Sequence, residues 1–578
     1  MTTRRQFLTR AGLSLLTPFV VRGERPRRSR TASPKPALTT SDVFGLSVAS
    51  GDPSTTGVVL WTRINPEQYR PEEPLTFEVA VDVNFRRLVL TADVNAADFG
   101  PDRDHTVHLD LDGWLEPGRV YHYRFRYRDV FSRVGRCRTL PSPGTPLSSL
   151  KLGVVTCQDY TNGYYGAFAH LAHEDVDFVV HLGDLIYESV GDPAFQSLPY
   201  PDRIIELPSG QPAATGLDDY RFLYRQYRSD PLFQQCLEHH TMIAIWDDHE
   251  TANDCYWDYD RDTLGAPSHP LTVNDPNGGD PAVLRQLKLD AQRAWAEYVP
   301  ARVTFDPEAT HPFQALSIYR SFQFGQLAEL FCTDERTYRS PHPCGEDERI
   351  LTYGCGTQAD PDRTQLGPTQ KEWLVAGLTG SAAVWKVWAN EVLLGQLKIG
   401  PHPEDLFYLN LDAWDGFEAE RREILERFAD SGQRNLVALT GDLHCYMAAY
   451  LKTDYSQRSN RPGPNLVGVE FMTPAITSAT LIDLLLDWLT PDERAALQAA
   501  EARQPSRFYF ENLAQATNPH IHFFNGQEWG YSVVEFTPAA CTYTAYSVDT
   551  SVNSATAAKR LIRQIRVPVN QVRFVDVV

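Results

Sequence analysis

Residues 152–188 read LGVVTCQDYTNGYYGAFAHLAHEDVDFVVHLGDLIYE, and this stretch decides the fold of the chain. Two apolar runs, LGVV and DFVVHL, flank a segment with helical spacing, GAFAHLAHED. Short buried strands that are joined by a helix form a parallel βαβ unit. The pattern therefore predicts an α/β domain, in which side chains with chemical roles gather where parallel strands end.

Both predicted strands end in residues that can bind a metal as anions. Cys157 follows the first strand in TCQD, and Asp184 and Tyr187 follow the second in GDLIYE. Thiolate, carboxylate and phenolate groups are all metal ligands in proteins. A buried thiol, a turn aspartate and a core tyrosine are the more common roles of such residues, so this stretch alone leaves both interpretations open.

Further polar clusters follow strands later in the chain. TMIAIW (241–246) precedes DDHETAND, NLVALT (435–440) precedes GDLH, and Asn390 and Glu391 lie within the predicted strand VWKVWANEVLL (384–394). One Asp–His pair at a loop is usually a cap or an ion pair. Several strand ends in one sheet region that all carry Asp, His, Asn, Cys or Tyr favour a shared metal site.

Length and charge limit the classes of protein to consider. The 578 residues exceed one ordinary core, so two or more domains are expected. The net charge of −20 argues against a nucleic-acid-binding surface, and an anionic substrate would need cations placed locally. No apolar run is long enough to span a membrane.

Residues 1–23 have the pattern of an export signal. TRRQFL contains the twin arginines Arg4 and Arg5, and a short, weakly apolar run follows from Ala11 to Val21. A chance basic start is the alternative. The pattern predicts recognition by the twin-arginine export machinery and a periplasmic, cell-envelope or extracellular location. Residues 24–40 are basic and rich in Pro, Ser and Thr, which predicts a linker.

The rest of the chain divides by its hydrophobic patterns. Residues 41–143 contain alternating runs such as LTFEVAVDV without helices between them, which predicts an antiparallel β-sandwich of immunoglobulin-like size. The α/β domain is expected over 148–548, with helices over 285–298, 371–378, 418–429 and from 491, and a C-terminal extension over 549–578. Cys344 and Cys355 flank a polar loop and are the most plausible disulfide pair among the nine cysteines.

The blocks TCQD, GDLIYE, WDDHE and GDLH together resemble the PhoD-type alkaline phosphatases and phosphodiesterases, a group of metallophosphoesterases. The tyrosine of GDLIYE also resembles the purple acid phosphatases. FGLSVASGDPSTTGVVLWTRI, WDGFEAER and NPHIHFFNGQEWGY are similar to other segments of the PhoD-type family, so the resemblance covers nearly the whole chain. It implies a four-layer α/β/β/α catalytic domain, a binuclear metal site and secretion through the twin-arginine route.

The resemblance also implies two sets of metal ligands. Fe(III) would be held by anionic ligands and one imidazole, from Cys157, Asp184, Tyr187 and His444. The second metal would share Asp184 and add Asp248, Asn390 and Asp442, with Glu391 as the alternative to Asn390. Oxygen ligands favour Ca(II) over Zn(II), as the family implies. Asn253, Asp254 and His520 are further candidates, although two imidazoles like His520 and His522 more often pack in a core or lie on a surface.

Two residues are candidates for catalysis on a phosphate-ester small molecule. His249 would donate a proton or a hydrogen bond to the phosphate or the leaving group, or else orient Asp248. Arg336 would clamp the phosphate, or else form a structural ion pair. The implied reaction is hydrolysis by a metal-activated water without a covalent enzyme intermediate. Redox turnover at an Fe(III)-tyrosinate and a non-catalytic, metal-stabilised surface-binding protein are the alternatives.

Overall fold

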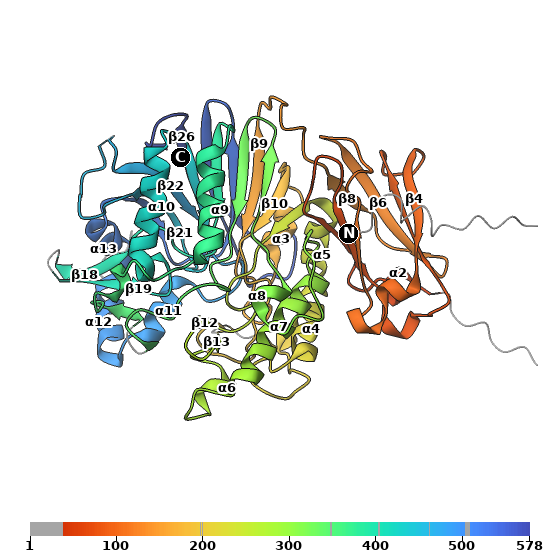
Figure 1. Ribbon diagram of the computed structural model, residues 1–578, viewed down its shortest axis with the longest axis horizontal. Coiled ribbons are helices and arrows are strands. Elements are labelled where there is room, and N and C mark those ends of the chain that lie inside the picture. Colours follow the sequence, from red (N-terminus) through yellow and green to blue (C-terminus); the bar gives the residue numbers. More distant parts are fainter. Residues whose placement is uncertain are drawn as a thin grey trace, which may run out of the picture. The chain divides into compact units, whose positions relative to one another are not determined.

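The computed structural model describes residues 38–196, 198, 200–346, 349–402, 405–461, 463–502 and 509–578 (Figure 1). The predicted export signal and nearly all of the predicted linker lie outside these ranges. Within them, no helix has both the length and the apolar character needed to cross a membrane. The fold is mixed α/β, with a β-rich region at its N-terminal end.

The predicted βαβ unit is confirmed and forms the centre of a large sheet. Strand β9 (Leu150–Val155), helix α3 (Gly166–Leu171) and strand β10 (Phe178–His181) follow one another, and the two strands pair in parallel. Strand β11 (Thr241–Ala244) pairs in parallel with β10 and ends two residues before the predicted end at Trp246. The sheet has ten strands in the order β27-β26-β25-β24-β9-β10-β11-β1-β2-β5.

A second sheet supplies the other predicted strand ends. Its seven strands run in the order β14-β15-β17-β20-β22-β21-β23, and β15, β17, β20 and β22 are parallel. Strand β17 (Trp385–Ala389) ends before Asn390, so Asn390 and Glu391 follow the strand and do not lie within it as predicted. The reason is that pairing of β17 with its neighbour stops at Ala389, after which the chain turns.

The two sheets share a hydrophobic core. Phe178 contacts Phe324 with ring centroids 5.3 Å apart, and Phe471 stacks on Tyr543 at 4.6 Å. Side chains of the second sheet alternate, so Val387 enters this shared core and Trp388 faces the opposite side. On that opposite side pack helices α9 (Gly367–Gly380) and α10 (Glu418–Asp430) (Figure 1).

The other strands of the two sheets and the longer helices have the following bounds. The large sheet also contains β24 (Gly530–Phe536), β25 (Ala540–Val548), β26 (Lys559–Pro568) and β27 (Val575–Asp576), so the predicted C-terminal extension contributes its last two strands. The second sheet contains β14 (Arg320–Phe324), β15 (Ala328–Cys332), β20 (Leu436–Thr440), β21 (Tyr446–Lys452), β22 (Leu466–Met472) and β23 (Ile521–Asn525). The longer helices are α4 (Leu217–Arg228), α5 (Pro231–His239), α7 (Pro281–Tyr298), α11 (Leu481–Trp488), α12 (Pro491–Ala502) and α13 (Tyr509–Thr517). Helices α7, α9, α10 and α12 confirm the four predicted helices.

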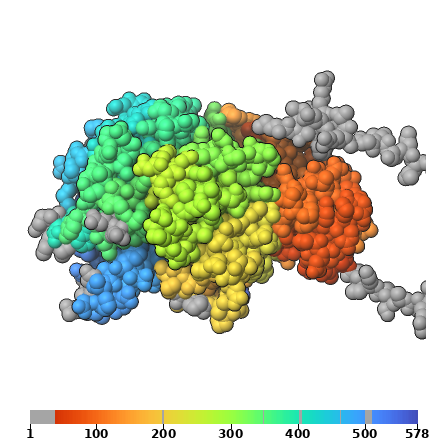
Figure 2. Space-filling view, turned by 60° about the horizontal axis from the view of Figure 1, so that its bottom comes forward, coloured from red at the N-terminus to blue at the C-terminus, as the bar shows by residue number. Residues whose placement is uncertain are grey.

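The β-rich N-terminal region contributes to two sheets. Strands β3 (Leu75–Ala80), β4 (Leu88–Val94), β6 (Val120–Tyr127), β7 (Val130–Phe131) and β8 (Gly135–Arg138) form a five-stranded sheet of their own. In contrast, β1 (Val48–Gly51), β2 (Val59–Arg63) and β5 (Thr106–Asp110) extend the ten-stranded sheet, because β1 pairs in parallel with β11. Figure 2 shows the N-terminal region, in red and orange, against the yellow and green segments.

A buried ion pair fastens this N-terminal extension of the sheet to the second sheet. Asp52, at the end of β1, is 1% exposed and accepts two hydrogen bonds of 2.7 Å from the guanidinium of Arg320 in β14. It also accepts a 2.6 Å bond from the backbone N–H of Arg302. The negative charge of Asp52 therefore offsets a cation that is itself largely removed from water.

Replacing Asp52 with Asn is expected to destabilise the whole fold, because it leaves Arg320 buried without its counter-charge. The loss is about 3 kcal/mol, as for other buried pairs that lose one partner. Chemical denaturation followed by tryptophan fluorescence measures it. Glu372→Gln is the matched control, since Glu372 pairs with Arg427 at the surface and is 59% exposed. Equal effects of the two variants would contradict the proposed role of Asp52.

Candidate metal centre

The predicted strand ends of the two sheets meet at one place. Cys157 follows β9, Asp184 follows β10 and Asp248 follows β11, whereas Asp442 and His444 follow β20 of the second sheet. Together with Asp247 and His249, they form three overlapping groups, in each of which the ligand atoms lie within 4.8 Å of one another: first Cys157, Asp184 and His444; second Asp247, Asp248 and Asp442; and third Asp184, Asp248 and His249. Asp184 and Asp248 each belong to two groups, so the groups form one continuous cluster.

Four residues at the strand ends have a left-handed backbone conformation, which is unusual for residues other than glycine. The φ angles are 54° at Cys157, 56° at Asp184, 62° at Asp442 and 51° at His444. Each such residue costs about 1–3 kcal/mol, and such residues gather at functional sites. The chain thus accepts strain at the strand ends, where the turn brings these side chains into one cluster.

Two glycines allow the strand-end loops to approach each other. Gly183 precedes Asp184 and has φ of 104°, and a Cβ atom there would lie 2.5 Å from the Cβ of Asp247. Gly441 precedes Asp442, and a Cβ atom there would lie 2.7 Å from Oγ1 of Thr156, which directly follows β9 of the other sheet. Both Gly-Asp pairs therefore need glycine for close contact between loops.

The first group has donors that suit a cation. Cys157, Asp184 and His444 are buried, and Oδ1 of Asp184 has no hydrogen-bond partner among the described residues. The hydroxyl of Tyr187 lies 3.3 Å from Nε2 of His444. The other nitrogen, Nδ1, lies 2.5 Å from the carbonyl of Ala479, which accepts a hydrogen bond from it and leaves the Nε2 lone pair for a ligand bond.

The electrostatics of this group call for a positive charge. The pKa of the Cys157 thiol and that of the Tyr187 hydroxyl are both raised. Burial is the larger cause, and the nearby carboxylate of Asp184 is the second. Burial lowers the pKa of His444 to about 4, which leaves the imidazole neutral. A bound cation stabilises thiolate and phenolate, so the residues present fit a metal.

The second group contains Asp247, which the sequence interpretation omitted. Asp247 is the first aspartate of DDHE, and its Oδ2 is buried without a hydrogen-bond partner among the described residues. Burial raises the pKa of Asp247 to about 7. Burial and, second, the neighbouring carboxylate of Asp247 raise the pKa of Asp442 well above its usual value. Three carboxylates in one group, of which Asp247 and Asp248 are buried, again favour a cation with oxygen ligands.

Arg336 is surrounded by these carboxylates. Its guanidinium donates to Asp247 at 2.6 Å, to Asp412 at 2.6 Å and to Asp442 at 2.8 Å, and its side chain is 0% exposed. The carboxylate of Asp412 also contacts Arg339 at 2.7 Å. These contacts are those of the structural ion pair that the sequence left open, and they occupy all three nitrogens of Arg336.

Asn390 and His520 are placed differently from the cluster. The side-chain oxygen of Asn390 accepts a 2.8 Å bond from the indole of Trp414, and its amide nitrogen donates to the Val392 carbonyl. Nε2 of His520 lies 2.7 Å from the Gln396 carbonyl, and its ring packs on Tyr455. The structure therefore engages both side chains with partners outside the three ligand groups.

His249 is held on both sides. Its Nδ1 lies 2.6 Å from the carboxylate of Glu188, and its ring lies over Tyr187 with centroids 4.1 Å apart. The other oxygen of Glu188 accepts a 2.8 Å bond from the N–H of Asn253. Burial lowers the pKa of His249, but Glu188, Asp248 and Asp184 outweigh burial and raise it well above its usual value.

The carboxylate of Glu250 joins two strand-end loops. Its oxygens accept hydrogen bonds from the backbone N–H groups of Asp184 at 2.9 Å, Leu185 at 2.5 Å and Asp247 at 2.7 Å. Its side chain is buried. The sequence pattern gave no role to Glu188 or Glu250, although Glu188 ends the segment GDLIYE and Glu250 ends WDDHE.

Comparison with known proteins decides the family. The PhoD-like phosphatase family model matches residues 152–545, and the model of the PhoD-like phosphatase N-terminal domain matches residues 30–141. The chain belongs to the PhoD-like phosphatase family. Alkaline phosphatase D of Bacillus subtilis (strain 168) is 31% identical over 502 residues, which are 86% of this chain and 76% of that protein. A solved structure titled "Structure of PhoD" has a TM-score of 0.75 at 28% identity and covers 94% of each chain.

The remaining candidates of this PhoD-like phosphatase lie beside the second ligand group. The N–H of Asp254 donates to Oδ2 of Asp248 at 2.6 Å, and Asn253 precedes it in the same loop. Asp442, Asn253 and Asp254 are partly exposed, whereas Cys157 and Asp184 are buried. Solvent therefore reaches the centre from the side of these three residues.

Glu250→Gln is expected to lower metal affinity by about tenfold or more. The amide NH2 of Gln cannot accept the backbone N–H groups that the carboxylate of Glu250 accepts, so Asp184 loses part of its support. Metal content per chain after dialysis against graded chelator measures the loss. Glu420→Gln is the matched control, since buried Glu420 accepts hydrogen bonds from the N–H groups of Gln365 and Leu366 and from the Thr364 hydroxyl, none of which belongs to a ligand group. Unchanged metal content in a folded Glu250→Gln protein would contradict this role.

Proposed function

We propose that this protein hydrolyses phosphate esters at a binuclear metal centre, as an alkaline phosphatase or phosphodiesterase. The observation that carries the proposal is the set of three overlapping ligand groups that share Asp184 and Asp248. Two cations that share a carboxylate need such an arrangement. Membership of the PhoD-like phosphatase family supports the same activity.

The donor types support the choice of metals. Fe(III) fits the first group together with Tyr187, because thiolate, carboxylate and phenolate are anionic ligands. Ca(II) fits the oxygen-rich second group, in which we include Asp247 beside Asp248 and Asp442 and give Asn390 no ligand role. When bound, the metals would bind the phosphoryl group, lower the pKa of a water and stabilise negative charge on phosphorus.

The chain's own residues position the reacting groups. His249, fixed through Nδ1 by Glu188, is the proposed hydrogen-bond donor to the leaving-group oxygen. Its backbone N–H also donates to Oδ1 of Asp248 at 2.9 Å, which supports an orienting role for its main chain as well. Arg336 keeps Asp247 and Asp442 close together by offsetting their charge.

The fold and compartment complete the proposal. Two sheets with a shared core and helices on their outer faces are the arrangement expected of a four-layer α/β/β/α domain over residues 148–548. The five-stranded sheet and the β1-β2-β5 edge are the two candidate sheets of an immunoglobulin-like sandwich over residues 41–143. The twin arginines support export through the twin-arginine machinery to the periplasm, cell envelope or exterior.

Hydrolysis and metal content test the activity together. The purified protein is expected to release nitrophenol from a nitrophenyl phosphate monoester or diester, to contain iron and calcium, and to be coloured. Tyr187→Phe removes the phenolate, so its visible charge-transfer band should shift or vanish. Tyr220→Phe should keep the band, because the hydroxyl of Tyr220 is bonded at 2.6 Å to the carbonyl of Thr251. Absorption spectra and metal analysis on the same samples provide the comparison.

Two results would separate the alternatives. A colourless, iron-free and fully active enzyme would refute the iron assignment but keep the phosphoesterase. A metal-loaded protein that hydrolyses neither ester would favour the surface-binding alternative. Removal of calcium with a selective chelator should abolish hydrolysis while the colour persists, since the second ligand group has only carboxylate oxygens from Asp247, Asp248 and Asp442.

The export proposal has its own test. Replacing both Arg4 and Arg5 with Lys is expected to retain the folded, active protein in the cytoplasm, because the machinery reads arginine and not charge alone. Cell fractionation followed by ester hydrolysis in each fraction measures this. Normal export of the double variant would show that another signal is used.

A further inference from the structure

A partly exposed cation, Arg349, lies on the exposed side of the metal centre. Arg349 forms an ion pair through Nε with Asp254 at 3.0 Å, and its side chain is 16% exposed. Asp254 in turn contacts Asp248 through its backbone N–H at 2.6 Å. Arg349 is therefore linked through Asp254 to the candidate ligand Asp248, on the side from which solvent reaches the cluster.

The other arginines near the centre are closed off from a substrate. The side chains of Arg336 and Arg339 are both 0% exposed and contact carboxylates such as Asp412. Lys288, which donates to Oγ1 of Thr251 at 3.0 Å, is also buried. Among the described residues that contact the site carboxylates, Arg349 is the cation that an incoming anion can reach.

Arg349 is held in a defined position but is not saturated. Its Nη1 donates to Glu346 at 3.2 Å, and its backbone carbonyl accepts a 2.7 Å bond from the N–H of Leu411. No described residue accepts a hydrogen bond from its Nη2. One edge of a fixed guanidinium is thus available for a charge-assisted hydrogen bond.

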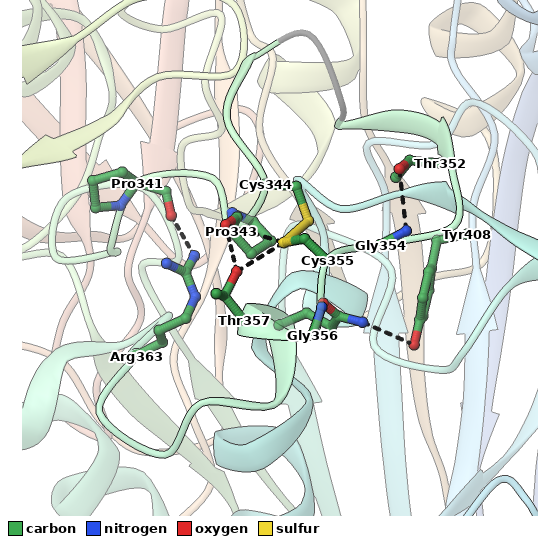
Figure 3. The surroundings of a disulfide bond; sticks show 11 residues. Pro341, Pro343, Cys344, Thr352, Gly354, Cys355, Gly356, Thr357, Arg363 and Tyr408 are labelled. Carbon is green, nitrogen blue, oxygen red and sulfur yellow. Dashed lines mark hydrogen bonds between the residues drawn. A yellow bond between two sulfur atoms is a disulfide. The ribbon is translucent and has the colours of Figure 1, made fainter.

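A disulfide fastens the loop that carries Arg349. Cys344 and Cys355 are bonded, as the sequence predicted, and they enclose Glu346 and Arg349 in one covalent loop. Figure 3 shows the disulfide beside contacts between the chain segments that flank the loop, namely the hydroxyl of Thr357 with the carbonyl of Pro343 and the guanidinium of Arg363 with the carbonyl of Pro341. The cross-link limits the loop's freedom, which keeps Arg349 beside Asp254.

We propose that Arg349 is a specificity-determining residue that binds a non-bridging oxygen of the substrate's phosphoryl group and so favours monoesters over diesters. The inference rests on the proposed phosphoesterase function and names its preferred substrate class. The chain carries a net charge of −20, and Glu346, Asp254 and Asp442 are acidic at the entrance, so a doubly charged substrate needs an accessible cation there.

The chemistry of the two ester classes explains the preference. A phosphomonoester carries nearly two negative charges near neutral pH and has three non-bridging acceptor oxygens. A diester carries one charge and replaces one of those oxygens with a second substituent. Arg349 adds one charge-assisted donor at the entrance, which a dianion with a spare oxygen uses fully and a diester uses less.

Steady-state kinetics on a nitrophenyl phosphate monoester and a bis(nitrophenyl) phosphate diester test the proposal. For Arg349→Ala, kcat/KM for the monoester is expected to fall by about tenfold or more, and for the diester by less than about threefold. The fall should lie mainly in KM, and inhibition by inorganic phosphate should weaken in parallel. Arg349→Lys should recover part of the loss, because it keeps the charge but not the fork.

Arg427→Ala is the matched control, since Arg427 pairs with Glu372 at 2.6 Å on the surface. This variant is expected to leave kcat/KM unchanged for both esters. Equal losses for both esters, or no loss for the monoester, would overturn the proposal, as would an unchanged inhibition by phosphate. If the wild type hydrolyses neither ester, the proposed function fails and this inference fails with it. Hydrolysis by the wild type with unaltered ester selectivity in Arg349→Ala refutes the inference alone.

Discussion

Three backbone N–H groups that converge on one buried carboxylate, Glu250, set the geometry on which the site depends. Two donors belong to the loop after β10 and the third to the loop after β11. The carboxylate thereby fixes Asp184 in its left-handed conformation and holds Asp247 beside it. Without such an acceptor, the two loops would present buried, unpaired donors to each other, at a cost of about 1–3 kcal/mol for each group.

The second sheet uses the same device. Glu470, in β22, accepts hydrogen bonds from the N–H groups of Leu394 and Gly395 and from the hydroxyl of Thr440. It therefore ties the chain after β17 to the end of β20, immediately before Gly441 and Asp442. Each half of the centre has one buried glutamate behind its ligands, and the two halves meet where Gly441 approaches Thr156. Positive charge from Arg336 and the proposed cations then balances the carboxylates that these contacts bring together.

Local pattern predicted the fold and the outline of the site, and tertiary contacts decided the rest. Strand–helix alternation and strand-end polar residues are local signals, and they pointed to Cys157, Asp184 and Asp442, which follow strands whose ends adjoin in the structure. Asn390 was predicted within a strand, but the strand ends before it and the indole of Trp414 occupies its oxygen. The spacing rules for helices and strands cannot predict that contact, because Trp414 is 24 residues away from Asn390 in the sequence. For the same reason, the sequence alone did not distinguish a catalytic Arg336 from a structural one.

The most direct test of this account is the position of iron in the metal-loaded protein, determined by anomalous diffraction at the iron absorption edge. The account predicts one peak within bonding distance of the Cys157 sulfur and Nε2 of His444, with Tyr187 as a further ligand. The same peak is expected to weaken in Glu250→Gln crystals while the seven-stranded sheet stays in place. A peak among Asp247, Asp248 and Asp442 instead, or full iron occupancy in the variant, would contradict it.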